Sequence, residues 1–343
     1  MRLALRAAEK GRGRVHPNPL VGAVVVSGKK LLSTGAHEFF GGPHAEVNAL
    51  RRLSRVPPNA TLYTTLEPCV HFGKTPPCVD LIRLKKIRRV VVAAKDPNPL
   101  VSGKGLRCLK KAGVQVTFGL LGKEAEAMNR DFKQWVLKKV PYVTAKIAQS
   151  LDGKTVTPGG ESRWITGKKA RRFAHGLRAK ADAVLVGVNT VLEDDPRLTV
   201  RMGRVAQDPV KVVLDATLRT PSSAKIFSSR AKVFIFTTRR APAKKRRALS
   251  KKAEIFTVKE NGRGRVDWKE TLRILGKKSI VHLLVEGGAE VLASAFEAGV
   301  VNEAYFFTAP IVIGGQKRLN KASTFRSYER KAVGGDFLFH GVL

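Results

Sequence analysis

The residues of this chain whose types and spacing could do chemistry lie between positions 44 and 78. They are one histidine, one glutamate and two cysteines: His44, Glu46, Cys69 and Cys78. Zinc binds thiolate and imidazole in a tetrahedron, and a catalytic zinc keeps one position for water. The histidine and the two cysteines would leave that position open. Glu46 would then take a proton from the activated water and pass it to a leaving nitrogen.

The elements that must position these side chains are two helices and the loop before the second one. Pro76 and Pro77 open a helix predicted over 78–84, whose positive end favours the Cys78 thiolate. A second helix is predicted over 44–53. Residues two apart point about 200° apart on an ideal helix, so His44 and Glu46 can converge only in the looser geometry of a first turn.

The pattern His-x-Glu followed by Pro-Cys matches the signature of the zinc-dependent deaminases of bases. His-Ala-Glu alone would often occur by chance, but joined to Pro68-Cys69 and Cys78 it is specific. The non-catalytic alternative is a closed structural zinc site with His71 as fourth ligand. Because His71 comes two residues after Cys69, it fits a pocket wall or a phosphate contact better.

The spacing of the cysteines departs from that of nucleic-acid deaminases, which usually have two residues between them. Here eight residues, 70–77, separate Cys69 from Cys78. The enlarged loop resembles the deaminase half of the bifunctional riboflavin-biosynthesis deaminase/reductase family. The motifs that carry this resemblance are His-Pro-Asn-Pro at 16–19, Pro-His-Ala-Glu-Val at 43–47, Thr-Leu-Glu-Pro-Cys at 65–69, Thr-Pro-Pro-Cys at 75–78 and Asp-Pro-Asn-Pro at 96–99.

Other polar residues of the first half have two readings. Asn18, just before a predicted strand, could bind the ring edge of a ligand, and a turn role fits it equally well. His16 and His37 have no ligand-like partners in the sequence, so we expect packing or turn roles. Cys108 occupies an apolar helix position and is expected to be a buried structural thiol.

The second half has two informative features of its own. Glu286-Gly287-Gly288 follows a predicted buried strand, where glycines let backbone N–H groups approach a phosphate, although a tight turn explains them equally. The segment 162–166, Ser-Arg-Trp-Ile-Thr, is polar with one large ring. Arginines follow at 171, 172 and 178, and arginine suits phosphate, but a solvated helix face accounts for the first two.

The resemblance extends over the second half and implies a dihydrofolate-reductase-like fold that uses NADPH. It is carried by the segments 150–154, 162–166, 177–179, 187–199 and 286–288. The resemblance implies cofactor contacts at Ala148, Trp164, Thr190, Asp194, Ala216, Gly288, Ala289, Glu290, Val291, Leu292, Ala293 and Ser294. It implies substrate contacts at Ser162, Arg178, Leu198, Arg201 and Glu286. Arg239 and Arg240, after a strand, are candidates for the 2′-phosphate of NADPH.

Strands alternate with helices along the whole chain, which indicates layered α/β sheets. We expect a cytidine-deaminase-like three-layer domain over 1–139 and a dihydrofolate-reductase-like α/β domain over 140–343. The predicted strands are 21–26, 31–35, 61–66, 89–94, 114–118, 142–148, 183–187, 210–214, 233–237 and 280–285. The predicted helices are one that ends near Gly11, then 44–53, 78–84, 103–112, 123–136, 167–180 and 289–298.

Length and composition fit this two-domain reading. The 343 residues contain 43% hydrophobic residues and 31 glycines, as in compact α/β proteins. No run of about 18 apolar residues predicts a membrane span, and the N-terminus lacks the apolar core of a signal peptide. We therefore expect a cytoplasmic protein without a membrane partner. Both ends are short, which could trim the contacts of an expected homo-oligomer, a dimer or a tetramer.

The charge is the unusual feature: 64 Lys and Arg against 27 Asp and Glu give a net charge of +37. Such a field attracts polyanions, so a nucleic-acid base deaminase is the alternative function, and a non-catalytic binding protein is a second one. The basic residues are scattered, except for a run at 244–247 with Lys251 and Lys252. Together with the cysteine spacing this favours no specific nucleic acid.

The function expected from these observations is a bifunctional enzyme of riboflavin biosynthesis that carries one Zn²⁺ per chain and uses NADPH. Its small-molecule substrate would be a phosphoribosylaminopyrimidine. Hydrolytic deamination of 2,5-diamino-6-(5-phosphoribosylamino)pyrimidin-4(3H)-one would come first. Reduction of the ribosyl side chain would then give 5-amino-6-(5-phosphoribitylamino)uracil. No acid for the second step is evident in the sequence.

Overall fold

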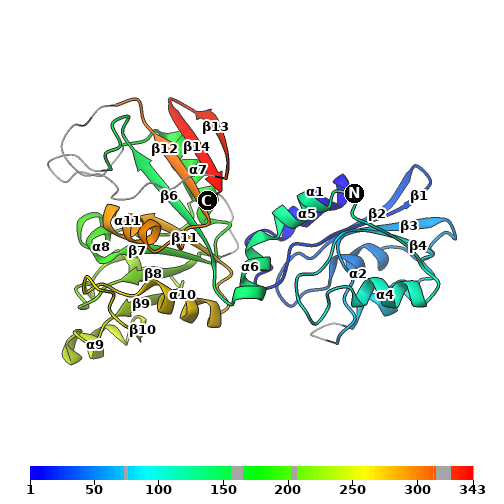
Figure 1. Cartoon of the computed structure of the whole chain (residues 1–343), viewed down its shortest axis with the longest axis horizontal. Coiled ribbons are helices and arrows are strands. Elements are labelled where there is room, and N and C mark those ends of the chain that lie inside the picture. Colours follow the sequence, from blue (N-terminus) through cyan, green and yellow to red (C-terminus); the bar gives the residue numbers. More distant parts are fainter. Residues whose placement is uncertain (73–75, 156–164, 202–206, 312, 314–325, 343) are drawn as a thin grey trace. The chain divides into compact units, whose positions relative to one another are not determined.

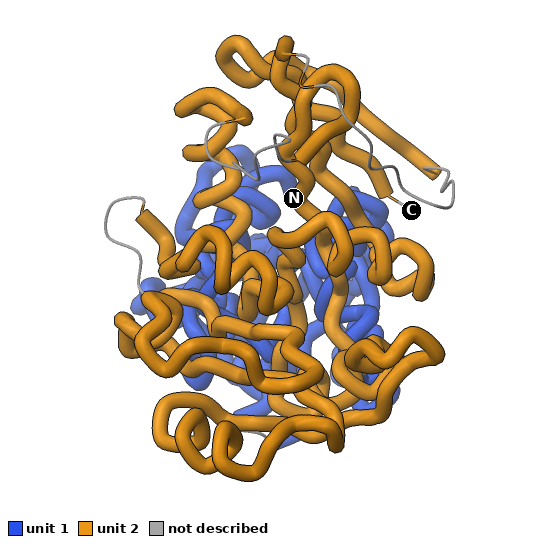
Figure 2. Tube along the Cα trace, turned by 90° about the vertical axis from the view of Figure 1, so that its left-hand side faces the viewer, with its two compact units in different colours: residues 1–139 blue, residues 140–343 orange. Residues whose placement is uncertain are grey.

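The structure, a computed structural model, describes residues 1–72, 76–155, 165–201, 207–311, 313 and 326–342 (Figure 1). The chain divides into two compact units, Met1–Lys139 and Val140–Leu343 (Figure 2). Each unit has its own sheet. Two of the predicted contact residues, Ser162 and Trp164, lie outside the described residues. In the described part of the chain, no helix is long and apolar enough to cross a membrane.

The elements of the first unit are α1 (Arg2–Ala8), η1 (Glu9–Gly11), β1 (Gly22–Ser27), β2 (Lys30–Ala36), α2 (Ala45–Leu50), β3 (Ala60–Leu66), α3 (Cys78–Leu84), β4 (Arg89–Ala94), α4 (Lys104–Lys111), β5 (Gln115–Phe118), α5 (Gly122–Met128) and α6 (Arg130–Lys138). The strand order is β2-β1-β3-β4-β5. Strand β1 pairs antiparallel with β2 and β3, whereas β3, β4 and β5 are parallel.

Helices cover both faces of this sheet, which makes the first unit three-layered (Figure 1). One face packs against α2, α3 and α4, whose Leu50, Ile82 and Leu109 are fully buried with sheet residues such as Leu62 and Val90. The other face packs against α1 and α5. Because β3 and β4 are parallel, their carboxyl ends meet at one edge, and the loops that follow them lie side by side there.

Two helix predictions in this unit are wrong in their bounds. The segment 123–136 forms two helices, because the buried Asn129 leaves helical geometry at φ −113°. Its side chain accepts from the Leu20 N–H at 2.7 Å and donates to the Leu20 carbonyl at 2.9 Å. The helix expected over 44–53 ends at Leu50, and it starts only at Ala45, since His44 has extended backbone and is its N-cap residue.

The elements of the second unit are β6 (Tyr142–Gln149), α7 (Lys168–Arg178), β7 (Ala183–Gly187), α8 (Val188–Asp194), β8 (Val210–Leu214), η2 (Lys225–Phe227), β9 (Val233–Thr237), α9 (Ala243–Leu249), β10 (Glu254–Thr257), α10 (Trp268–Lys277), β11 (His282–Gly287), α11 (Ala289–Glu297), β12 (Glu303–Thr308), β13 (Ser327–Val333) and β14 (Asp336–Val342). The strand order is β10-β9-β8-β7-β11-β6-β12-β14-β13. The first seven are parallel, and the last two add an antiparallel edge.

This sheet also lies between two helical layers. Helices α10 and α11 bury Leu272, Leu275 and Leu292 against one face. Helices α7, α8 and α9 bury residues such as Leu177 and Leu249 against the other. Strands buried on both faces read as apolar runs, and three of them, β7, β8 and β9, match the predicted bounds. The mixed α/β class with two sheets is confirmed.

Candidate functional site

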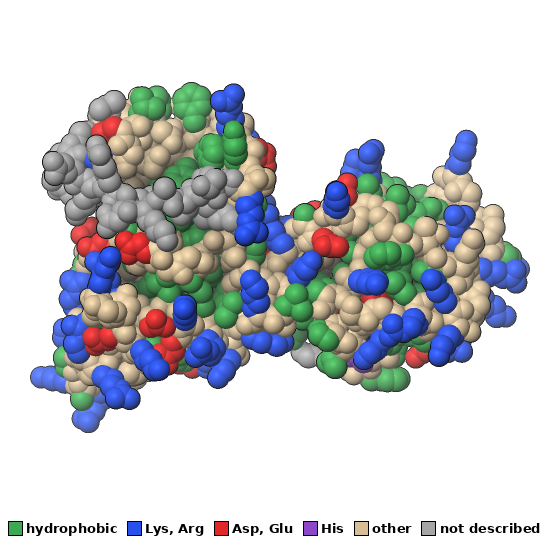
Figure 3. Space-filling view, in the orientation of Figure 1, with side chains coloured by type: hydrophobic (Ala, Val, Ile, Leu, Met, Phe, Trp, Pro, Cys, Tyr) green, Lys and Arg blue, Asp and Glu red, His purple; other side chains and the backbone are tan. Residues whose placement is uncertain are grey.

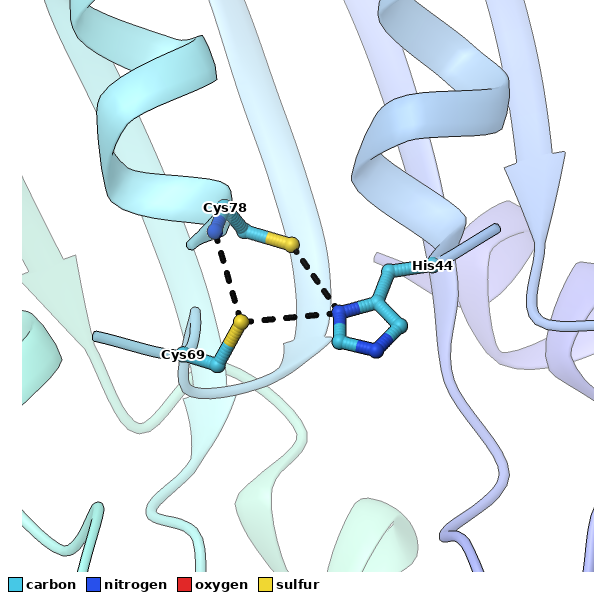
Figure 4. A group of neighbouring side chains, drawn as sticks. All are labelled: His44, Cys69 and Cys78. Carbon is cyan, nitrogen blue, oxygen red and sulfur yellow. Dashed lines mark hydrogen bonds between the residues drawn. The ribbon is translucent and has the colours of Figure 1, made fainter. Parts of the chain in front are cut away.

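Three side chains that the sequence singled out converge in the first unit (Figure 4). The Cys78 Sγ lies 3.2 Å and the Cys69 Sγ 3.5 Å from the His44 Nδ1. All three ligand atoms lie within 4.8 Å of one another, and they form the one group of three such residues among the described residues that could hold a metal ion. We call His44, Cys69 and Cys78 the ligand triad.

Each residue of the triad is placed by the end of an element. His44 precedes α2 and Cys78 begins α3, while Cys69 follows β3 in the loop between them. The backbone N–H of Cys78 donates to the Cys69 Sγ at 3.3 Å. This bond is the first-turn N–H of a helix directed at sulfur, which favours a thiolate there.

The two thiols and the imidazole share protons. The hydrogen bond from the Cys78 thiol, together with His44, lowers the pKa of Cys69, whereas the Cys69 sulfur and burial raise the pKa of Cys78. The hydrogen bond to Cys69 raises the pKa of His44. Without a cation, one thiol of the pair thus keeps its proton. A dication bound by these three ligand atoms would allow both thiols to ionise, since thiols lose their protons on coordination. The triad therefore fits zinc.

Glu46 lies beside the triad in the first turn of α2 and is 3% exposed. Burial raises the pKa of Glu46, and its carboxyl group hydrogen-bonds the Cys78 thiol. His44 and Glu46 converge because the helix starts between them, not because a first turn is loose. A buried carboxyl whose protonated form is favoured can both accept and return a proton near neutral pH.

A second histidine, His37, packs against the His44 ring and holds its orientation. The His37 Nδ1 donates to the Pro43 carbonyl at 3.1 Å, and its Nε2 lies 3.1 Å from the Asn18 amide nitrogen, which can donate only to an unprotonated ring nitrogen. The rings of His37 and His44 meet edge to face, with centroids 5.6 Å apart. Burial lowers the pKa of His37 and keeps it neutral. The packing expected for His37 is therefore packing against the triad.

Glu67, which the sequence indicated only as part of a motif, anchors the loop that carries Cys69. Its buried carboxylate accepts from the N–H of Gly103 at 2.8 Å and of Leu106 at 3.1 Å, which ties α4 to this loop. Burial raises the pKa of the nearby Asp96 to about 6. The only sequence signal for this role was a carboxylate directly before Pro-Cys. Its hydrogen-bond partners are backbone N–H groups, which cannot be identified from residue types.

The second unit has a charged cluster that joins two predicted substrate residues. The Glu286 side chain is 3% exposed and accepts from the Arg178 Nε at 2.5 Å and Nη2 at 2.8 Å. Lys146 of β6 lies 3.6 Å from the same carboxylate. Burial alone would raise the pKa of Glu286, but Arg178 and Lys146 outweigh it and lower the pKa to about 2. Lys146 was missed, although it is a lone cation in an apolar strand.

Two more predicted substrate residues adjoin this cluster. Arg178 also donates to the Thr199 carbonyl at 3.1 Å, which holds the segment containing Leu198 and Arg201. Leu198 is buried, with φ of 51°, and the Arg201 N–H points to the His175 Nδ1 at 3.3 Å. The structure therefore gathers Arg178, Glu286 and the 198–201 segment.

The predicted cofactor residues are only partly gathered. Thr190 of α8 lies where a Cβ on Gly288 would be 3.2 Å from its Oγ1, so close packing explains this glycine as well as a phosphate does. Ala148 shares the sheet face of Lys146. The Asp194 residue ends α8, and the Ala216 carbonyl, in the turn after β8, accepts from Thr238.

Along α11, the predicted contacts differ in what their side chains can reach. Leu292 is buried in the core and the Ser294 hydroxyl accepts from Trp268, so a contact from either would have to use the backbone. Ala289 and Glu290 are exposed, and Glu290 lies 3.6 Å from Arg265. Val291 packs toward Gly187, and Ala293 is half-buried. Arg239 and Arg240 are both exposed, and Arg240 pairs with Glu260 at 2.8 Å.

Comparisons with known proteins cover both units. The chain matches the model of the RibD C-terminal domain over residues 141–334 and that of the cytidine and deoxycytidylate deaminase zinc-binding region over residues 1–94. The riboflavin biosynthesis protein RibD of Aquifex aeolicus is 45% identical over 314 residues, which cover 92% of this chain and 87% of that protein.

Two solved structures are similar over nearly the whole chain. A diaminohydroxyphosphoribosylaminopyrimidine deaminase/5-amino-6-(5-phosphoribosylamino)uracil reductase from Thermotoga maritima has a TM-score of 0.86 and 34% identity, with 100% of this chain and 97% of that one covered. RibD from Acinetobacter baumannii has a TM-score of 0.88 and 34% identity, with 99% and 97% covered. The chain therefore belongs to the RibD family of riboflavin biosynthesis and combines a deaminase with a reductase.

Proposed function

We propose that the first unit, residues 1–139, hydrolytically deaminates 2,5-diamino-6-(5-phosphoribosylamino)pyrimidin-4(3H)-one, and that the second, residues 140–343, reduces the ribosyl side chain to the ribityl product. The observation that supports the first step best is the ligand triad with buried Glu46 beside it. The name of the Thermotoga maritima protein contains both activities. We assign the substrates in that name to this chain because it belongs to the same family.

In the first unit, His44, Cys69 and Cys78 would hold one zinc ion. Zinc supplies a water whose pKa is lowered enough to attack at neutral pH. Glu46 takes a proton from the attacking water and returns one to the departing amino group, which leaves as ammonia. Its raised pKa suits both halves of this transfer. His37 keeps the His44 ring oriented, because both nitrogens of His37 are already committed.

In the second unit, NADPH would supply the hydride that converts the opened ribose to ribitol. Arg178 and Lys146 are held by one buried carboxylate, Glu286, so the cluster keeps a net positive charge toward a phosphorylated substrate. We assign these residues and the 198–201 segment to the substrate, and the region of Thr190 and Gly288 to the cofactor. Catalysis would be mostly positioning, since holding reactants in the reactive geometry removes much of the barrier.

Replacing Glu46 by Gln tests the deaminase assignment. We expect deamination to fall about 10³-fold, because the proton carrier is lost, while zinc content stays at one per chain and reduction of the deaminated substrate is unchanged. The matched control is Glu124→Gln, an exposed glutamate of α5, which should leave both activities intact. Turnover by Glu46→Gln at the unmodified rate would overturn the mechanism.

The reciprocal substitution, Arg178→Met, separates the two sites. Reduction should fall by at least 10²-fold while deamination by the same preparation persists, since Arg178 and the triad belong to different units. Loss of both activities together would contradict the two-site assignment. Deamination of an RNA or DNA oligomer with none of the free pyrimidine would instead favour the nucleic-acid alternative.

A further inference from the structure

A basic hollow lies between α3 and α4 of the first unit, apart from the ligand triad. Its volume is about 390 Å³, within the range of small-molecule sites. It is lined by Arg83, Lys104, Arg107, Cys108, Lys111 and Ala112. None of the triad residues and no aspartate or glutamate is among these lining residues. We call it the α3–α4 hollow.

The hollow follows from the sequence of α4. Lys104, Arg107, Cys108 and Lys111 recur at the spacing that places side chains on one face of a helix. The other face buries Leu106 and Leu109 in the core. Figure 3 shows Lys and Arg side chains gathered around the position of α4. The fold thus collects cations on this face and adds Arg83 from α3 across the hollow.

Three of these four cations are not neutralised by any of the described residues. Arg83 lies 3.8 Å from Asp80, an exposed pair, but Lys104, Arg107 and Lys111 have no hydrogen-bonding or ionic partner for their side chains among the described residues. Helix α4 starts with Lys104 and has no acidic residue in its first turn, whereas α3, α5 and α6 each have one. Cations at a helix start and like charges four residues apart both destabilise a helix.

We propose that the α3–α4 hollow binds a small oligophosphate, a ligand that neither the zinc site nor the reductase cluster accounts for. Cations that surround a concavity focus the field on one spot and raise the local concentration of anions. Arginine guanidinium groups bind phosphate oxygens in pairs, and lysines add point charges. A ligand with several phosphates matches four cations better than a single phosphate does.

Two observations favour a small ligand over a nucleic acid. The lining residues include no aromatic ring, whereas sites for single strands combine a basic track with rings on which bases stack. The four cations also surround one hollow rather than a long strip. The basic residues of α9, by contrast, are mostly exposed, and the helix has no acidic residue in its first turn. They are not among the residues that line the α3–α4 hollow, so they serve as the control surface.

The first experiment measures binding of inorganic tripolyphosphate to the zinc-loaded full chain by calorimetry. Arg107→Glu with Lys111→Glu reverses two charges in the hollow. Arg247→Glu with Lys251→Glu reverses the same residue types at the same spacing on the exposed surface around α9. We expect Kd to rise at least 10-fold in the first variant and less than twofold in the second. Equal weakening in both would assign binding to the net charge and overturn the proposal.

The second experiment uses Cys108 as a reporter, because this thiol, expected from the sequence to be buried, is only half-buried and lines the hollow. The neutral reagent iodoacetamide labels it, and mass spectrometry of the Cys108 peptide separates it from the triad. Saturating tripolyphosphate should slow labelling at least fivefold in the natural protein and leave it unchanged in Arg107→Glu/Lys111→Glu. Labelling of Cys108 that ignores tripolyphosphate in the natural protein would overturn the proposal.

Two further arms define the ligand chemistry. Citrate, a carboxylate anion without phosphate, should bind at least 10-fold more weakly than tripolyphosphate; equal binding would refute phosphate recognition. A single-stranded RNA oligomer that displaces tripolyphosphate at lower concentration and protects Cys108 would identify a nucleic-acid surface instead. Circular dichroism and zinc content of both variants must match the natural protein, as expected for four exposed positions.

Discussion

At the scale of single residues, the side chains that orient a candidate metal ligand are as informative about the site as the ligand itself. His37 has both nitrogens engaged, one by the Pro43 carbonyl and one by Asn18, and its ring packs edge to face against His44. The sequence left Asn18 between a ligand contact and a turn role, and the structure gives it a third role. Replacing a residue that orients a metal ligand typically lowers the affinity for the metal 10- to 100-fold.

We therefore predict that Asn18→Ala lowers the zinc affinity of the protein about 10-fold, because His37 then keeps only its hydrogen bond to Pro43 and its ring is held less firmly against His44. Competition with a chromogenic chelator measures this. Asn59→Ala, which removes only an exposed hydrogen bond with Ser27, is the control and should retain the natural affinity. If Asn18→Ala and Asn59→Ala bind zinc equally well, the support role is wrong.

A second prediction at this scale concerns Glu286 and acid. The pKa of its carboxyl is lowered from 4.5 to about 2 in the folded protein, so the ionised form stabilises the fold. This stabilisation, about 3 kcal/mol, is complete above pH 4.5 and is lost as the pH falls toward 2. Glu286→Gln removes it, so the difference in unfolding free energy between the two proteins should be constant from pH 7 to 5.

The stabilisation should then shrink by about two fifths at pH 3.5, because most of the unfolded carboxyl is protonated there while the folded one is not. Urea unfolding at pH 7, 5 and 3.5 gives the required free energies. A free-energy difference that stays the same down to pH 3.5 would show that Arg178 and Lys146 do not hold the carboxylate as the geometry indicates.

At the scale of elements, α4 reaches the ligand triad through the loop that carries Cys69. A Cβ on Gly105 would meet the Pro68 carbonyl at 2.1 Å and the Glu67 side chain at 3.0 Å. No L side chain fits there, so this glycine sets how closely α4 approaches the loop. Gly176, inside α7, has nothing within 4 Å of the same position and normal backbone geometry.

The two glycines give a matched pair of substitutions. Gly105→Ala should destabilise the protein by about 2 kcal/mol or more and reduce zinc content, because the backbone at Pro68 must move. Gly176→Ala should stabilise it by roughly 0.5–1 kcal/mol, since alanine is the better helix former. Urea unfolding and metal analysis measure both. Full zinc content in Gly105→Ala would mean that the Cys69 loop does not depend on α4.

The bounds of several elements could be predicted from the sequence alone. Strands β7, β8 and β9 and helix α3 were predicted with their bounds, because burial on both faces gives continuous apolar runs and Pro-Pro marks a helix start. The ligand triad was predicted from residue types, since soft ligands with deaminase spacing have few other uses. Here local pattern and tertiary environment agree, and the pattern alone is enough.

The sequence was insufficient where tertiary contacts decide. Helix α9 buries only Leu249, and β13 is exposed along most of its length, so neither has an apolar period to read. The break at Asn129 depends on Leu20, which lies 109 residues away. Lys146 meets Glu286 only because β6 and β11 are neighbours in the sheet. Such pairings appear only once the topology is known.

At the scale of the whole molecule, the net charge of +37 is spread over many basic side chains, as the visible face in Figure 3 shows. Spread charge of one sign draws anions to the surface without choosing among them. Selection requires cations around a concavity, as in the α3–α4 hollow, or cations held by a buried carboxylate, as at Glu286. The charge therefore explains attraction, and we propose that the two local arrangements provide recognition.

The division of the chain into two functional domains at 139/140 is a proposal that the separated parts can test. The buried clusters of residues 1–139 and of residues 140–343 share no member, so each part has its own core. A part of this size with its own core generally folds alone. We predict that fragment 1–139 unfolds cooperatively, binds one zinc and deaminates the pyrimidine, and that fragment 140–343 reduces the deaminated product.

The measurement is denaturant unfolding of each purified fragment, followed by zinc analysis and both activity assays. Mixing the fragments should restore the two-step conversion at the rate of the slower fragment, because neither set of site residues crosses the boundary. A control cut at 121/122 removes α5, which covers one face of the first sheet, together with α6, and should leave an N-terminal fragment that unfolds without cooperativity. If the fragment 1–139 behaves like that control, the first unit is not an independent domain, and its deaminase site depends on residues beyond 139.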